Sequence, residues 1–408
     1  MSDSSQPSVA AGALRAGALA FALVALLAFA PAAGASPDPV AGGSVKLTFK
    51  KGFVNSLRKQ GVKIVRAKPA TLKGRQATLP VSGGSVDPLT GQGTVTLAGG
   101  LNFKAGKRRA QVRALSIDTA KKGLFAKVAG KRMRFASLAG ISFSRDGFGT
   151  RVTVKRLKLT GSVAARLNKK LRHGKRRAPV KANRLMAGAS VAAQPSTVAI
   201  QASGNATLAL SPAAVSKIAG VGTPPYPAGE SPVAVKLEPL PPTSVLALGP
   251  PPTVAFPVVG GSIAPDASTG TIQHAGGLRL VQNLEGVSKV PGDVTTLTLS
   301  NIWVDLGTRQ ATVEVTIANP VRPEANLGSL GRVSIADINL AGASVTPDPA
   351  GRTIAIANAS ATLQAVTAET LNEVFINGLE KASPLFAGQT KFAAGDPLGT
   401  FSVTVQTQ

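Results

Sequence analysis

The sequence predicts an all-β protein made of two tandem antiparallel sandwich-like or barrel-like domains with short helices. Three observations support this prediction: alternation of apolar and polar residues, turn-forming dipeptides between the alternating segments, and an internal duplication. Period-two alternation is typical of strands with one buried face. It occurs at Val45/Leu47/Phe49, Ile141/Phe143, Leu157/Leu159, Leu297/Leu299, Val313/Val315/Ile317 and Ile354/Ile356. Pairs such as Asp146-Gly147 and Asp348-Pro349 separate these segments, as expected for turns between strands.

The duplication is visible as short motifs that recur in the same order. Residues 79–85 (LPVSGGS) recur as FPVVGGS, and residues 93–101 (GTVTLAGGL) recur as GTIQHAGGL, both 177 positions later. Leu-Ala-Gly at 138–140 recurs 202 positions later, and Leu-Asn at 167–168 recurs 204 positions later. Because several matches share one order, we interpret the chain as two copies of one unit, the second with longer loops.

Two short helices are expected in each unit. Ser211-Pro212 predicts an N-cap followed by proline at the first helical position, with Val215 and Ile218 facing inward. The second helix has an apolar face formed by Val163, Leu167 and Leu171 in the first unit, and by Leu371, Val374 and Phe375 in the second.

These patterns divide the chain into four parts. We expect a secretory signal peptide at 1–35, a strongly basic first domain at 36–171, a linker at 172–203 and a second domain at 204–408. A proline-rich stretch, 223–252, lies inside the second domain. It is predicted to form an extended excursion outside the core.

The N-terminal segment has the order of an export signal. Arg15 precedes an uncharged apolar run at 16–30, and Ala33 and Ala35 form a small-residue cleavage pattern that would leave Ser36 as the new terminus. The alternative is an uncleaved anchor, but a helix of that length falls short of the ~30 Å hydrocarbon core. No later stretch predicts a membrane span. We therefore expect a secreted or cell-surface protein.

The composition argues against an enzyme. The chain has no cysteine, two histidines, one tyrosine and one tryptophan. Nucleotide-binding glycine motifs, a G-x-S-x-G nucleophile elbow and a calcium loop are absent from the sequence. His173 lies among cations without an orienting carboxylate, and His274 stands in a predicted strand where the first unit has Leu97. No catalytic residue is assigned, and His274 is either a structural histidine or a ligand.

Positive charge is concentrated in the first unit. Residues 45–185 contain 35 Lys and Arg but three acidic residues, whereas residues 186–408 have a net charge of −4. This density predicts attraction to an anionic polymer of the cell wall, to anionic lipid headgroups or to extracellular DNA. The alternative is a solvated face, and sequence-specific nucleic-acid recognition is not expected. The candidate anion-binding residues are Lys104, Lys107, Arg108, Arg109, Lys131, Arg132 and Arg134.

The order of the motifs resembles the HtaA domain, a haem-transport-associated module of secreted and surface proteins in actinobacteria. The resemblance lies in the opening strand at 47–49, the Gly-Thr strands at 93 and 270, the Leu-Asn helices, and the ending at 392–400. It implies a β-rich fold and haem binding through a tyrosine with a nearby histidine. Segments 53–57 and 213–217, where the family tyrosine would lie, contain none. The haem-ligand candidates are therefore His274 and Tyr226, with no metal expected beyond haem iron.

Two functions follow from these observations. One is haem binding and haem acquisition at the cell surface, with haem and a haem-uptake system as partners. The alternative is a non-catalytic module of the cell envelope that binds an anionic surface polymer through its basic first domain.

Overall fold

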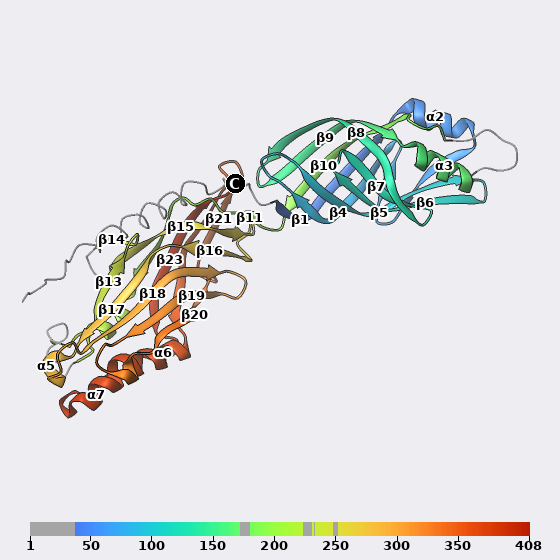
Figure 1. Cartoon of the computed structure of the whole chain (residues 1–408). Coiled ribbons are helices and arrows are strands. Elements are labelled where there is room, and N and C mark those ends of the chain that lie inside the picture. Colours follow the sequence, from blue (N-terminus) through green and yellow to red (C-terminus); the bar gives the residue numbers. More distant parts are fainter. Residues whose placement is uncertain (1–36, 172–179, 223–230, 232, 248–251) are drawn as a thin grey trace, which may run out of the picture. The chain divides into compact units, whose positions relative to one another are not determined.

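The alternating residues form the inward faces of two closed antiparallel sheets, each with eight strands in its ring (Figure 1). This confirms the predicted all-β class. The computed structural model describes residues 37–171, 180–222, 231, 233–247 and 252–408. The expected signal peptide at 1–35 lies outside the described residues. In the described part, no helix is long and apolar enough to cross a membrane.

The first barrel closes because β4 pairs with both β1 and β5. Around the ring, neighbouring strands are β1 (Asp38–Phe49), β4 (Gln76–Val86), β5 (Gly93–Ala105), β6 (Arg108–Asp118), β7 (Gly123–Val128), β8 (Lys131–Asp146), β9 (Gly149–Leu159) and β10 (Leu185–Pro195). Two short strands, β2 (Val62–Ala67) and β3 (Thr71–Lys73), extend β5 and β4. Helices α2 (Lys51–Lys59) and α3 (Gly161–Leu171) lie at one end of this barrel.

The second barrel closes through β16, which pairs with both β15 and β18. Its ring consists of β12 (Asn205–Leu210), β15 (Thr253–Ile263), β16 (Gly270–His274), β18 (Val294–Asp305), β19 (Gln310–Ala318), β20 (Gly328–Asn339), β22 (Thr353–Leu363) and β23 (Pro397–Gln406). The sheet continues through β11 (Val198–Ala199), β13 (Lys236–Leu240), β14 (Ser244–Ala247), β17 (Gly277–Asn283) and β21 (Ser344–Asp348).

Helices cover one end of the second barrel. They are α4 (Pro212–Ala219), α5 (Glu285–Ser288), α6 (Ala365–Leu371) and α7 (Gly378–Ala382), with a π-helical segment at Asn372–Asn377 and 3-10 turns at Pro323–Ala325 and Pro384–Phe386. Ser211 caps α4 as predicted, because its hydroxyl accepts a hydrogen bond from the Ala214 amide at 3.0 Å. The predicted apolar faces of α3 and of the helical segment at 371–375 are buried. In α4, by contrast, Val215 remains half-buried.

The repeated glycine motif marks a place where neighbouring strands come very close. A Cβ atom on Gly84 would lie 2.0 Å from the Thr94 carbonyl oxygen, and one on Gly261 would lie 2.0 Å from the Thr271 carbonyl oxygen. Their φ angles are +126° and +116°, a region that side-chain-bearing residues rarely adopt. The close approach of β4 to β5, and of β15 to β16, therefore requires glycine at these positions.

The repeated Leu-Asn pair has a structural role in both barrels. Asn168 donates to the Val180 carbonyl and accepts from the Val180 amide, at 2.8 and 2.9 Å. Asn372 makes the same pair of bonds with the backbone of Phe392, at 2.9 and 2.7 Å. Each asparagine thus joins a helix to the backbone of the segment that leads into the last strand of its ring.

The predicted linker at 172–203 is wrong in its central part. Residues 185–195 form β10, which pairs with β9 and with β1. Met186, Ala187 and Val191 of this strand are buried in the first barrel. The buried face of this strand includes Ala187, Ala189 and Ala193, and the low hydrophobic contrast of such a segment resembles that of a linker.

The proline-rich stretch at 223–252 also differs from the prediction where the structure describes it. Val233 and Val235 are buried, and β13 and β14 pair with β17 and β15. The first barrel has its counterpart in β2 and β3, which pair with β5 and β4. Proline is accommodated because these are short strands at the edge of the sheet, where an amide donor is dispensable.

The asparagine contacts give a direct stability prediction. Asn372→Ala removes both side-chain bonds and leaves the Phe392 backbone groups unpaired, so the free energy of unfolding should fall by about 1–3 kcal/mol. Urea unfolding followed by the fluorescence of Trp303 measures this, because the sole tryptophan lies in β18 of the second barrel. Asn326→Ala, at an exposed position, is the control. An equal loss in both variants would contradict the structural role.

Candidate functional site

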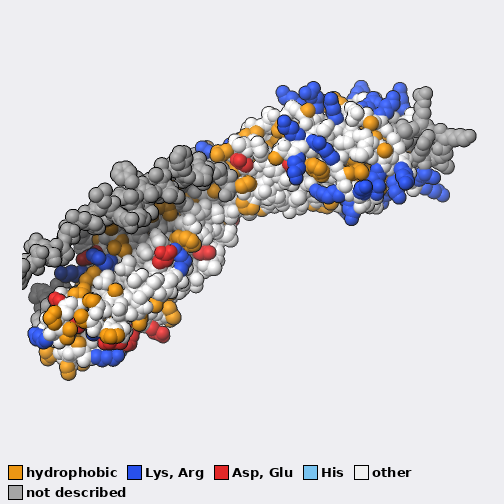
Figure 2. All heavy atoms as spheres, viewed as in Figure 1, with side chains coloured by type: hydrophobic (Ala, Val, Ile, Leu, Met, Phe, Trp, Pro, Cys, Tyr) orange, Lys and Arg blue, Asp and Glu red, His pale blue; other side chains and the backbone are white. Residues whose placement is uncertain are grey.

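The predicted anion-binding residues lie on β5, β6 and β8 of the first barrel and in the turn between β5 and β6, with β7 between β6 and β8. Lys and Arg cover much of the surface of this barrel (Figure 2). Lys104 is on β5, Arg108 and Arg109 are on β6, and Lys131, Arg132 and Arg134 are on β8; Lys107 is in the turn between β5 and β6. Arg132 donates to the Ala114 carbonyl and the Ser116 hydroxyl, and Arg134 donates to the carbonyls of Lys121 and Lys122. Some donors of both arginines are therefore used within the protein. Arg132 connects β8 to β6, and Arg134 connects β8 to the turn before β7.

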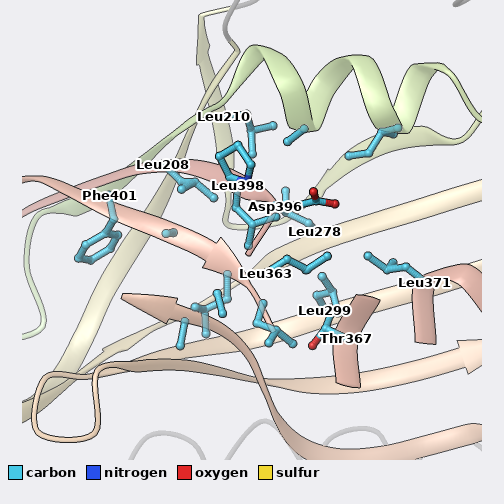
Figure 3. Close-up of a pocket in the computed structure, with 18 of the residues that line it drawn as sticks. Leu208, Leu210, Leu278, Leu299, Leu363, Thr367, Leu371, Asp396, Leu398 and Phe401 are labelled. Atoms are coloured by element: carbon cyan, nitrogen blue, oxygen red, sulfur yellow. The ribbon is translucent and has the colours of Figure 1, made fainter. Parts of the chain in front are cut away.

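An apolar cavity of about 220 Å³ occupies the interior of the second barrel (Figure 3). Leucines from different strands point into it from opposite sides, among them Leu208, Leu278 and Leu363. Helix α4 contributes Ala213, Ala214, Lys217 and Ile218 to one wall. Because almost every wall atom is carbon, the cavity favours an apolar ligand over water.

His274 is one of the residues in this wall, and one of its imidazole nitrogens has no hydrogen-bond partner among the described residues. Its side chain is 2% exposed, and its Nδ1 lies 3.0 Å from the Ile302 carbonyl oxygen. The carbonyl can only accept, so Nδ1 carries the proton and Nε2 keeps a free electron pair. Nε2 is buried and has no hydrogen-bond partner in the described structure. The Phe401 ring meets the imidazole edge to face at 5.8 Å and fixes its plane.

Burial keeps this imidazole neutral. Desolvation lowers the pKa of His274 from 6.5 to about 4, although the hydrogen bond to the Ile302 carbonyl acts in the opposite direction. A neutral imidazole with a free Nε2 is the form that coordinates a metal or accepts a hydrogen bond. The arrangement therefore provides an acceptor of fixed orientation in a mostly apolar wall.

The equivalent position in the first barrel shows that a histidine is not needed to complete the fold. Val81 on β4 pairs with Leu97 on β5, and Val258 on β15 pairs with His274 on β16, each beside the glycine motif. Leu97 is 4% exposed and belongs to the first core. Since leucine fills this position in the first barrel, His274 introduces an unpaired polar atom at a cost in stability.

Helix α4 covers the cavity without being part of the core. None of its residues is fully buried, although Ile218 packs partly against the core, and polar contacts add to its attachment. Lys217 forms an ion pair with Asp396, and the Ser211 hydroxyl donates to the Pro397 carbonyl. An element with few buried apolar contacts opens more easily than a core strand. Helix α4 is such an element, because it has fewer buried contacts than the core strands that form most of the rest of the described wall.

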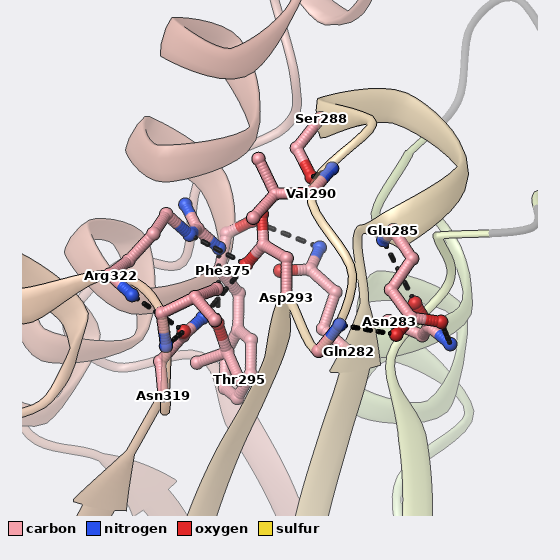
Figure 4. Close-up of polar contacts among 12 residues, drawn as sticks. Gln282, Asn283, Glu285, Ser288, Val290, Asp293, Thr295, Asn319, Arg322 and Phe375 are labelled. Carbon is pink, nitrogen blue, oxygen red and sulfur yellow. Dashed lines mark hydrogen bonds and ion pairs between the residues drawn. The ribbon is translucent and has the colours of Figure 1, made fainter.

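A buried polar cluster connects the segment before β18 with the segment after β19 in the second barrel (Figure 4). Asp293 precedes β18, whereas Asn319 and Arg322 follow β19. The Asp293 carboxylate accepts from Arg322 Nε at 2.8 Å and from Asn319 Nδ2 at 2.9 Å, and both side chains also reach the Thr295 hydroxyl. The contacts satisfy Asp293 Oδ1, whereas Asp293 Oδ2 is buried without a hydrogen-bond partner in the described structure. Because the carboxylate is paired with Arg322, we interpret the cluster as structural.

The structure brings together some predicted site residues and leaves others undescribed. Tyr226 and His173 lie outside the described residues. Within the described part, no group of three or more His, Asp or Glu side chains could hold a metal ion. Sequence reasoning missed Lys217, Asp396 and the leucine walls, because no motif distinguishes cavity-lining leucines from core leucines.

The pKa of His274 predicts a pH-dependent stability that a leucine variant should lose. Its folded-state pKa lies below the unfolded value, so protonation favours the unfolded chain and stability falls as pH drops from 6.5 toward 4. The loss attributable to His274 is about 3 kcal/mol between about pH 7 and pH 4. Urea unfolding followed by Trp303 fluorescence should show this loss in the wild type beyond that in His274→Leu. Identical pH profiles for the two proteins would contradict a buried neutral imidazole.

Solved structures that match part of this chain come from Corynebacterium glutamicum. The heme-binding protein HtaB has a TM-score of 0.33 and 12% identity, covering 52% of this chain and 95% of that chain. The C-terminal domain of HtaA has a TM-score of 0.30 and 14% identity, covering 38% and 98%. No family model matches the chain, and no curated protein matches it. At these scores, the likeness identifies no site residue in this chain.

Proposed function

We propose that this chain is an exported, non-catalytic haem-binding protein that takes haem into its second barrel. The observation that carries the proposal is the free Nε2 of His274 in a wall of the apolar cavity. A porphyrin ligand needs apolar walls and an axial donor, and a neutral imidazole is a common donor to haem iron. The motif resemblance to the HtaA domain supports the same ligand class.

The side chains fit haem in donor type and in wall character. His274 would hold the iron through Nε2, while the Ile302 carbonyl keeps the ring oriented through Nδ1. The leucines and Phe401 would contact the macrocycle, and Lys217 lies at the cavity wall where an anionic propionate could pair with it. Bound iron would supply the redox-active centre, and the protein would supply its axial ligand and exclude water.

Size is the property in which the cavity and haem differ. At about 220 Å³ it is smaller than the ~300–1,000 Å³ of sites that enclose drug-sized ligands. The proposal therefore requires a wall to move outward on binding, and we assign this movement to α4, which has no fully buried residue. Breaking the ion pair between Lys217 and Asp396 would release it.

A haemin titration of the full chain tests the proposal. We expect one haem per chain, with a Soret band and quenching of Trp303 that persist at high salt, because coordination is not screened as surface adsorption is. His274→Leu should weaken binding by more than about tenfold while the protein stays folded, since leucine fills the matching position of the first barrel. His173→Leu, at the other histidine, is the matched control. Binding that disappears at high salt, or that is unchanged in His274→Leu, would contradict the proposal.

The part played by α4 has a separate kinetic test. Lys217→Met keeps the length and packing of the side chain but removes its ion pair with Asp396. Stopped-flow absorbance should show faster haemin association with an unchanged Soret position, because opening is easier while His274 is intact. An unchanged association rate would mean that haem does not enter past α4.

A further inference from the structure

Cations on the first barrel stand in register across neighbouring strands. On β2, β5 and β6, Lys63 lies directly opposite Lys104, and Lys104 lies directly opposite Arg109. All three side chains are exposed. The three residues therefore form a row at right angles to the strands, with one cation at each strand spacing of about 4.8 Å.

A second row continues the pattern on the next strands. Arg113 on β6 lies opposite Lys127 on β7, and Lys127 lies opposite Arg132 on β8. Arg109 and Arg113 both belong to β6 and are four residues apart, so they share one face of that strand. The two rows are thus joined by β6 into a single cationic track over β2, β5, β6, β7 and β8.

This arrangement costs stability when nothing is bound. Like charges directly opposite each other destabilise a sheet. In the described part of the first barrel, the ion pairs are Lys121 with Asp118 and Arg151 with Asp146, and neither includes a residue of the two rows. Arg113 Nη1 is in addition buried without a hydrogen-bond partner in the described structure. If these cations served only to keep the surface hydrated, nothing would be gained by placing them directly opposite one another.

We propose that the cationic track, formed by Lys63, Lys104, Arg109, Arg113, Lys127 and Arg132, binds a linear polymer of phosphate groups. Successive phosphates along a flexible chain can follow the rows across the curved wall of the barrel. Arginine and lysine both pair with phosphate, and arginine can do so through two parallel hydrogen bonds. A flat membrane would touch the convex wall only along a narrow strip, and duplex DNA is too stiff to follow it.

The test compares two variants of the full chain that lose the same charge. The row variant is Lys63→Gln, Lys104→Gln and Arg109→Gln. The matched control is Lys46→Gln, Lys59→Gln and Arg156→Gln, in which Lys46 faces Thr78 and Ser190 and Arg156 faces Ala139. Binding of linear inorganic polyphosphate is measured by calorimetry at low salt. The row variant should lose at least about tenfold in affinity, whereas the control should lose far less.

Thermal unfolding separates a binding role from a structural one. The row variant should melt at or above the wild-type temperature, because facing like charges have been removed. If the triple substitution instead lowers the melting temperature, Lys104→Gln alone replaces it, since Lys104 faces a cation on both sides. Equal affinity losses in the row and control variants would overturn the proposal, because net charge alone would then explain binding. Row-dependent binding to phosphatidylglycerol vesicles or duplex DNA, without binding to polyphosphate, would overturn it as well.

Discussion

Closure of the sheet is the constraint on which both barrels depend. When eight strands form a ring, every second side chain points into a shared interior, and that interior has to be filled or left as a cavity. The first barrel fills the position beside its glycine motif with Leu97. The second barrel places His274 there and keeps an apolar cavity behind it. The two barrels thus differ at an inward-facing position beside the same motif.

The same ring separates two kinds of binding surface. Outward positions are free of packing constraints, so the first barrel can carry a dense array of cations without disturbing its core. Inward positions are sheltered from water, so the second barrel can keep an imidazole neutral and unpaired. The proposed contacts with a phosphate polymer and with haem therefore use opposite faces of similar sheets, and each accepts a local loss of stability where its ligand would bind.

Much of the fold could be predicted from the sequence, whereas much of the site could not. Alternation such as Val45, Leu47 and Phe49 identifies strands because one face is buried, and the repeated glycines locate a close strand contact. Strand β10 was missed because its small residues carry little hydrophobic contrast. The cavity depends on the distance between walls, and the cationic track depends on register. The sequence therefore predicts Lys104, Arg109 and Arg132 as anion-binding residues but does not single out Lys63 and Lys127.

The central claim is that His274, in the cavity wall, keeps an unprotonated Nε2 without a partner in the described part of the protein, and nitrogen NMR of the two imidazoles tests it most directly. With 15N-labelled histidine in the full chain, His274→Leu assigns the signal of His274 against that of His173. Near pH 7, we predict a neutral ring with the proton on Nδ1 and an unprotonated Nε2 whose signal shifts when haemin is added. A proton on Nε2, or a ring that is charged at this pH, would contradict the account.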